Sequence, residues 1–139
     1  MRAVIDTNVF LAGLLNVDGG AAKIIRAFRD GAFEIVVSYE VFDEYVRVIH
    51  VFDNAVPGDK SEELLELVFA KAAKVRGAQA TGLCRDVNDE KFLSAALAGN
   101  AAFLVTKNRK HFPKRVSSVR IVTVREFLDE IERLRGQAK

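Results

Sequence analysis

The sequence predicts an α/β domain with a mainly parallel sheet of about five strands, and two periodicities indicate it. Short apolar runs rich in β-branched residues recur along the chain, as expected of buried strands. Between them lie longer runs whose apolar residues are three and four positions apart, as expected of amphipathic helices. Strands that alternate with helices of this size form βαβ units with parallel strands. We expect one domain over residues 1–139, which is long enough to bury a substantial core.

Composition narrows the class of protein. Hydrophobic residues make up 50% of the chain and charged residues 29%, which is typical of a globular domain and not of a disordered one. The net charge of +2 is too small by itself to indicate a nucleic-acid binder. Cys84 is the single cysteine, so no intrachain disulfide can form, which favours the reducing cytoplasm. No apolar run is long enough to cross a bilayer, and Asp6 would interrupt a signal-peptide core.

The expected elements follow one another with ordinary start and stop signals. Strands are expected at Ala3–Ile5, Phe33–Val37, Ala102–Thr106 and Val119–Val124, with a loop or weak strand over 77–82. Helices are expected at Val9–Leu15, around Ile24–Phe28, from Ser38 to about Phe52, from Glu62 to about Arg76, over Asp89–Leu97, and through Phe127, Leu128, Ile131 and Leu134. Ser38, Ser61 and Asn88 are the expected N-caps, and Gly31 and Gly99-Asn100 are the expected stops.

Two of these helices have an apolar side that the spacing defines. In the helix after Ser38 the expected inward residues are Val41, Tyr45, Val48 and Phe52. In the helix after Ser61 they are Leu64, Leu65, Val68 and Phe69. Each stripe predicts a helix that packs on the sheet with one face.

Acidic and amide side chains stand at comparable places in this topology. The positions are Asp6, Thr7 and Asn8 after the first strand, Glu44 in the helix after the second, Asp86 and Asp89 around the start of a later helix, and Thr106 and Asn108 at the end of the strand that follows. The carboxyl ends of parallel strands share one edge, so these side chains are expected to converge there. Two carboxylates about 4 Å apart repel by roughly 4 kcal/mol at an effective dielectric near 20, which protonation or a bound cation must offset.

Oxygen donors of this kind favour Mg²⁺ or Mn²⁺ over Zn²⁺. The two histidines, His50 and His111, are not expected among the acids, and there is no cysteine pair, so a zinc site is not expected.

Each polar residue also has a purely structural explanation. Asp6, Thr7 or Asn8 could cap the helix that starts near Val9, and Asp86 could cap or turn the chain. Asp89 is favoured in a first helical turn by the helix dipole alone. Glu44 could pair with Arg47 or with Lys residues on a solvated face, where Glu40 and Asp43 are its local rivals. For each residue alone, the structural explanation is at least as probable as a functional one. Together, the structural explanations do not account for the placement of these polar side chains at one shared edge of the sheet.

Four segments resemble the PIN domain family, and within it the VapC-like toxins of prokaryotic toxin–antitoxin pairs. The segments are Val4–Val9, Glu44-Tyr45, Arg85–Leu93 and Phe103–Asn108, and the likeness spans nearly the whole chain. The resemblance implies a three-layer α/β/α fold and a ribonuclease dependent on Mg²⁺ or Mn²⁺. It implies Asp6, Glu44 and Asp89 as catalytic and metal-binding acids, with Asn108 and Asp86 as weaker ligands and Thr7, Asn8 and Thr106 in support. An antitoxin partner and a homodimer are implied in the same way.

The chain departs from the family pattern at two places. Asn108 is neutral where many members have a fourth acid, and Val87-Asn88 replaces a Pro-Asp pair. Asn108 still offers a carbonyl oxygen, but the cluster has one charge fewer. A tightly held second metal ion is therefore not expected.

A loop rich in cations follows the strand that ends at Thr106. It contains Lys107, Arg109, Lys110, Lys114 and Arg115, with His111 and Phe112 among them. Such a loop beside an acidic site can contact phosphates and hold RNA, preferably single-stranded. A solvated lysine-rich loop is the equally weighted alternative.

Other functions compete with a ribonuclease. A HAD-type phosphatase needs a second Asp two residues after the first, where Asn8 stands, and no acidic pair of a receiver domain is found. A PIN-like module that binds RNA or protein without cutting remains open, because fold does not guarantee chemistry. An antitoxin could dock near Val9–Leu15 and Val41–Phe52, although these residues could equally be core.

Overall fold

Within residues 1–77 and 82–137, which the computed structural model describes, six strands form one sheet in the order β3-β2-β1-β4-β6-β5. The strands are β1 (Arg2–Ile5), β2 (Glu34–Val37), β3 (Ala73–Lys74), β4 (Phe103–Val105), β5 (Arg115–Val116) and β6 (Val119–Val122). All neighbours pair in parallel except β5, which is antiparallel to β6. The expected mainly parallel α/β sheet is confirmed, with the short β5 as an added edge.

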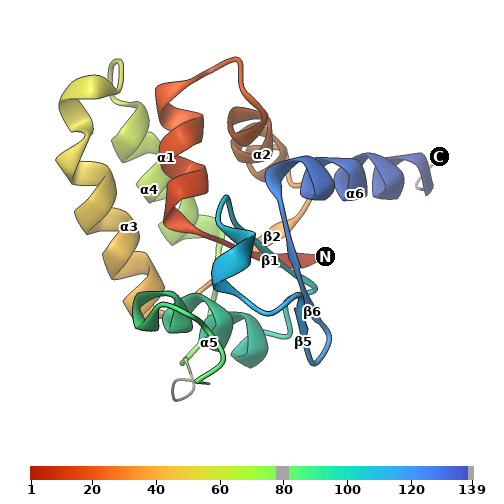
Figure 1. Ribbon diagram of the computed structural model, residues 1–139. Helices are drawn as coiled ribbons and strands as arrows, with labels where there is room; N and C mark the ends of the chain where they lie inside the picture. Colours follow the sequence, from red (N-terminus) through yellow and green to blue (C-terminus); the bar gives the residue numbers. More distant parts are fainter. Residues whose placement is uncertain (78–81, 138–139) are drawn as a thin grey trace.

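Helices cover both faces of this sheet. They are α1 (Thr7–Leu15), α2 (Gly20–Arg29), α3 (Tyr39–Val51), α4 (Lys60–Lys71), α5 (Glu90–Ala98) and α6 (Val124–Gln137), with short 3₁₀ turns η1 (Asp53–Ala55), η2 (Val87–Asp89) and η3 (Arg109–His111). Figure 1 shows α5 below the sheet, α2 and α6 above it, and α3 and α4 side by side at the left. The three-layer arrangement is therefore confirmed. Among the described residues, none of the helices combines the length and the hydrophobicity that a membrane span requires.

The core is centred on β1, whose residues Ala3–Ile5 are fully buried between the two helical layers. Above it the ring of Phe127 in α6 lies 4.9 Å from Phe33 and 5.7 Å from Phe103, both edge-on. The close approach of α1 and α2 favours a glycine, because a Cβ at Gly13 would lie 3.0 Å from the backbone carbonyl carbon of Ala21 as well as 2.6 Å from Ile25 Cδ1. These packing contacts hold the strands and helices in fixed positions, and so fix the place of the residues that follow the strands.

The expected helix from Glu62 to about Arg76 is wrong at its end. α4 stops at Lys71, and Ala73–Lys74 pair with Val36 and Val37 as β3. The reason is tertiary: the open edge of β2 offers backbone hydrogen bonds, which outweigh the local helical preference. Of the expected loop or weak strand over 77–82, residues 78–81 lie outside the described residues.

The expected caps are confirmed at Ser38 and Gly31 and wrong at two other places. Ser38 Oγ accepts the Val41 N–H at 3.2 Å, and Gly31 follows α2 with a φ of +82°. Ser61 lies inside α4, which begins one residue earlier. Asn88 caps nothing, because the Asp86 carboxylate accepts the Asn88 N–H at 2.9 Å and α5 begins only at Glu90.

The buried stripes are narrower than the spacing predicted. In α3 the fully buried residues are Val41, Tyr45 and Ile49, while Phe52 lies just past the helix end and is 39% exposed. In α4 Leu64 and Val68 are buried, but Phe69 is 61% exposed. One residue beyond Val68 the helix has turned by about 100°, so Phe69 faces solvent.

Candidate functional site

The site lies at the carboxyl ends of β1 and β4, which are neighbours in the sheet. Asp6 follows β1 directly, and its N–H donates to the Val105 carbonyl at 2.9 Å. Thr106 follows β4 directly, and its hydroxyl donates to Asp6 Oδ2 at 2.7 Å. Asp6 is 5% exposed and Thr106 is fully buried. The register of the two strands thus brings the buried Asp6 carboxylate within hydrogen-bond distance of the neutral Thr106 hydroxyl.

Glu44 reaches the same edge from α3. The neighbouring Tyr45 is fully buried and its hydroxyl donates to the Ile5 carbonyl, which fastens α3 to the end of β1. Glu44 Oε2 accepts the Thr7 hydroxyl, and Glu44 Oε1 accepts Lys91 Nζ at 2.7 Å. Both carboxylate oxygens of Glu44 therefore have a donor.

Asp89 approaches from the junction of η2 and α5, beside the first half of α3 (Figure 1). His111 Nδ1, from η3, lies 3.3 Å from Asp89 Oδ2, an ion pair only when the imidazole is protonated. That oxygen is buried and accepts no hydrogen bond from the residues that the structure describes. Asp89 thus presents a buried oxygen whose close neighbour is the His111 imidazole.

The three carboxylates act on one another electrostatically. Burial raises the pKa of Asp6 to about 6, and the negative charges of Asp89 and Glu44 add to the effect, while the hydrogen bond from Thr106 opposes it. Burial also raises the pKa of Asp89, as do the charges of Asp86 and Glu44, while His111 opposes the rise. The charges of Asp6, Glu44 and Asp89 (hereafter the acid cluster) therefore act on one another.

Other candidate residues stand at the margin of the acid cluster. The Asp86 side chain caps η2, so its structural explanation is borne out, although its charge still acts on Asp89. Asn108 is exposed, and its backbone N–H donates to Thr106 Oγ1 at 3.0 Å. Asn8 is exposed, whereas Thr7 is buried and bonded to Glu44. Arg47 pairs with Asp43 and not with Glu44.

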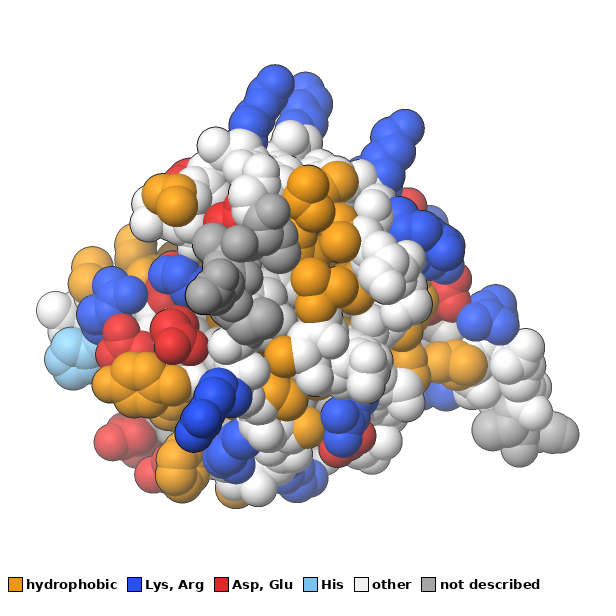
Figure 2. Space-filling model, turned by 90° about the horizontal axis from the view of Figure 1, so that it is seen from below, with side chains coloured by type: hydrophobic (Ala, Val, Ile, Leu, Met, Phe, Trp, Pro, Cys, Tyr) orange, Lys and Arg blue, Asp and Glu red, His pale blue; other side chains and the backbone are white. Residues whose placement is uncertain are grey.

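The cationic loop lies beside the acid cluster, because its His111 reaches Asp89 and its backbone accepts the Arg85 N–H. All five Lys and Arg residues expected in this loop are exposed, namely Lys107, Arg109, Lys110, Lys114 and Arg115, but Arg115 lies in strand β5 and not in the loop. Arg109 is engaged by Glu126 of α6. On the face shown in Figure 2, Lys and Arg side chains are scattered among acidic and hydrophobic ones. Positive charge is thus not concentrated on that face.

A family model described as PIN domain matches residues 2–110. The chain belongs to the PIN domain family. PIN domains are generally divalent-metal-dependent nucleases, so this membership supports a nuclease role for the chain. A search of curated proteins gives no match.

Two solved structures share this PIN fold. VapBC2 from Rickettsia felis, bound to a DNA fragment from its promoter, is 16% identical with a TM-score of 0.56, over 88% of this chain and 98% of that one. VapBC-1 from nontypeable Haemophilus influenzae is 21% identical with a TM-score of 0.58, over 90% and 99% of the two chains. At these identities the likeness establishes the fold.

The donor set of this PIN domain fits a hard divalent cation. It consists of carboxylate oxygens, of which Asp6 is held with a raised pKa and Asp89 Oδ2 is buried without a hydrogen bond among the described residues. As the side chains stand, no three His, Cys, Asp or Glu residues in the described part of the chain are arranged to hold an ion. Glu44 is turned to Lys91 and Asp89 to His111, so a shared ion requires both carboxylates to turn.

Sequence reasoning missed three residues of the PIN site, namely Lys91, Tyr45 and His111. The expectation that His111 lies away from the acids is wrong, because η3 folds back toward α5; His50 is indeed distant and pairs with Asp53. Lys91 could have been suspected from its place two residues after Asp89 in a first helical turn, where a cation is unfavourable without an acidic partner. Nothing in the sequence indicated that Tyr45 binds the β1 carbonyl.

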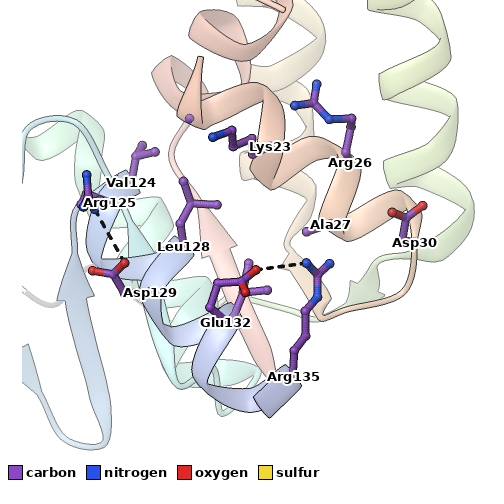
Figure 3. Close-up of a pocket in the computed structure, with 12 residues that line it drawn as sticks. Lys23, Arg26, Ala27, Asp30, Val124, Arg125, Leu128, Asp129, Glu132 and Arg135 are labelled. Carbon is purple, nitrogen blue, oxygen red and sulfur yellow. Dashed lines mark hydrogen bonds and ion pairs between the residues drawn. The ribbon is translucent and has the colours of Figure 1, made fainter. Parts of the chain in front are cut away.

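A separate cavity of about 950 Å³ lies between α2 and α6 of the PIN domain (Figure 3). Its lining includes Lys23, Arg26 and Asp30 from α2 and contains no member of the acid cluster. On the α6 side its acids are already paired, Asp129 with Arg125 at 3.6 Å and Glu132 with Arg135 at 3.3 Å. On the α6 side, each acid that lines the cavity is therefore already paired with an arginine.

Proposed function

We propose that this PIN domain is an endoribonuclease that uses Mg²⁺ or Mn²⁺ and binds it through Asp6, Glu44 and Asp89. The observation that carries the proposal is the buried Asp6 carboxylate beside two further carboxylates, with its pKa raised to about 6. Such an arrangement lowers the stability of the fold, and groups of this kind are found mainly where a function requires them. Asn108, through its carbonyl oxygen, and Asp86 are weaker candidate ligands.

Each residue of the site has a distinct task in this proposal. A bound divalent ion supplies an activated water and neutralises charge on the phosphate. Thr106 holds Asp6 Oδ2 in place, and Tyr45 holds α3, and so Glu44, against the end of β1. Asp89 Oδ2, buried and without a hydrogen bond among the described residues, is the candidate acceptor for the proton of the water. Thr7 orients Glu44, and Asn8 is left a supporting role at the rim.

RNA is the proposed substrate because a basic loop stands beside the acids. Lys107, Lys110, Lys114 and Arg115 are exposed and free to contact phosphates. Arg109 is the weakest candidate, since Glu126 already binds it. A single strand suits the site best, because its backbone can bend so that one phosphate reaches the proposed metal site beside the partly buried acids.

A toxin role with an antitoxin partner is the proposed biological setting, in the cytoplasm. Support comes from the VapBC complexes that share this fold. Of the two expected docking segments, α1 contributes Val9, Phe10 and Leu14 to the core. α3 and its end leave Val46, Val51 and Phe52 exposed, so a partner protein or a second copy would bind there.

The direct test is cleavage of a labelled single-stranded RNA by the purified chain. We expect cleavage with Mn²⁺ or Mg²⁺, none after EDTA, and recovery when the metal is restored. A DNA oligonucleotide of the same sequence serves as the substrate control. Cleavage that persists in EDTA would contradict the metal role, and cleavage of DNA alone would contradict the substrate.

The neutral Asn108 favours a second candidate, a PIN-like module that binds RNA or protein without cutting. With one acid fewer, the cluster holds a divalent ion less tightly. This candidate predicts that RNA is bound but left intact at every metal concentration in the same assay.

A further inference from the structure

Lys91 is a cation placed where helix electrostatics disfavour it. It is the second residue of α5, at the positive end of the helix dipole, where cations are destabilised. Its side chain is 22% exposed and that of its partner Glu44 is 17% exposed. The 2.7 Å contact from Lys91 Nζ to Glu44 Oε1 compensates this position. The two charges therefore depend on each other.

The same contact fills one of the oxygen donors that a divalent ion would use. Glu44 Oε2 accepts a hydrogen bond from the neutral Thr7 hydroxyl, whereas Glu44 Oε1 accepts one from the charged ammonium group of Lys91. Burial raises the pKa values of Asp6 and Asp89, and the negative charge of Glu44 adds to both rises. One ammonium thus offsets part of the charge of three carboxylates.

We infer that Lys91 is a built-in counterion of the acid cluster, which occupies Glu44 Oε1 in the metal-free protein and must leave it when a divalent ion binds. This inference rests on the proposed metal-binding function and deepens it. Metal binding becomes an exchange of cations at Glu44. Lys91 therefore stabilises the metal-free fold and raises the metal concentration at which the site fills.

The exchange distinguishes Lys91 from a merely structural residue. If the ion pair only held α5 against α3, its loss would loosen the site and weaken metal binding. If Lys91 competes with the metal, its loss tightens metal binding while it destabilises the metal-free protein. The two roles predict opposite changes in the metal dissociation constant.

The experiment is calorimetric titration of the full chain with MnCl₂. We expect Lys91→Met to lower the Mn²⁺ Kd at least about tenfold, equivalent to about 1.4 kcal/mol. Lys91→Arg keeps the charge and should keep the wild-type Kd. The matched control is Lys60→Met, which removes an exposed lysine from the first turn of α4, at the other end of the molecule from α5 (Figure 1). It should leave the Kd unchanged.

Thermal unfolding provides the second readout. Lys91→Met should lower Tm without metal, because Glu44 loses its cation, and Mn²⁺ should raise Tm more in this variant than in the wild type. If Lys91→Met fails to fold, Lys91→Gln replaces it, since the amide still donates to Glu44 without a charge.

The outcomes separate this inference from the proposed function. A wild type that binds Mn²⁺ and neutral Lys91 variants that bind it equally or more weakly would overturn the inference alone. Tighter binding in the variants without RNA cleavage by any protein would support the inference and overturn the nuclease. Absence of Mn²⁺ binding in every variant would overturn both.

Discussion

The acid cluster and the α2–α6 cavity both gather charged side chains, but they balance charge in opposite ways. In the cavity each acid of α6 has an arginine three or four residues away on the same helix. In the acid cluster Asp6 is 5% exposed and its hydrogen-bond partner is the neutral Thr106 hydroxyl. The cavity has a volume of about 950 Å³, yet the buried carboxylate whose pKa is raised lies at the carboxyl ends of the strands.

This difference explains why the sheet edge and not the cavity is the candidate site. Exposed ion pairs of the i,i+4 kind are worth only about 0.3–0.5 kcal/mol and are ordinary surface chemistry. A buried carboxylate beside two others destabilises the fold, and perturbed groups of that kind cluster where chemistry occurs. Unpaired buried charge is therefore a better guide to function here than hollow volume.

The largest expected effect is on the kcat/KM of RNA cleavage, compared between variants in which an acid of one region or of the other is made neutral. Asp6→Asn and Asp89→Asn should each lower kcat/KM by at least about 100-fold, because the carboxylates hold the ion and handle the proton. Asp129→Asn, in the cavity, should keep wild-type activity. Circular dichroism confirms that each variant is folded. A fully active Asp6→Asn would remove the distinction between the regions.

The second contrast is the dependence of stability on pH. The pKa of Asp6 rises from 3.8 to about 6 on folding, so its contribution is fully present below pH 3.8 and is lost as pH rises through about 6. Two pKa units correspond to about 3 kcal/mol of unfolding free energy. Wild type should lose this amount relative to Asp6→Asn between these pH values in urea denaturation without metal.

Asp129→Asn is the matched control for the pH dependence. Its partner Arg125 and its carboxylate are both exposed, so its curve should stay parallel to wild type. A curve for Asp6→Asn that also stays parallel to wild type would contradict the buried, repelled state of Asp6.

A smaller effect is expected from Thr106, whose hydroxyl is the neutral partner of Asp6. Thr106→Val removes the bond to Asp6 Oδ2 and the acceptor of the Asn108 N–H, and should cost about 1–2 kcal/mol of stability. Because that bond lowers the Asp6 pKa, the pKa should rise above about 6 in an NMR titration of the carboxyl carbon. Thr106→Ser keeps the hydroxyl and should titrate like wild type.

The smallest expected effect is on RNA affinity. Lys110→Glu and Arg115→Glu should each weaken binding several-fold and reduce the slope of log K against log salt by about 1, because each substitution removes one cation that neutralises a phosphate. Arg125→Glu, at the cavity, changes the net charge equally and should leave the slope unchanged. Equal slopes in all three variants would place the RNA elsewhere.

The sequence was sufficient for the parts of the site that depend on topology. Asp6 and Thr106 each follow a strand of the predicted parallel sheet, so their place at a shared edge could be predicted, whereas the pairing of β1 with β4 is known only from the structure. Ser38 was predictable because its cap is local. In contrast, β3 exists because β2 has an open edge, and the Lys91–Glu44 pair joins residues 47 positions apart on two helices. His111 reaches Asp89 only because η3 folds back, which no local pattern encodes.

The central claim is that Asp6, Glu44 and Asp89 bind one shared divalent ion, toward which Glu44 and Asp89 turn. The measurement that tests it most directly is anomalous diffraction from a crystal of the protein soaked in Mn²⁺. We expect a peak within bonding distance of Asp6 and Asp89, with Glu44 Oε1 released from Lys91. A fully soaked crystal with no peak at this edge of the sheet, and the Lys91–Glu44 contact intact, would contradict it.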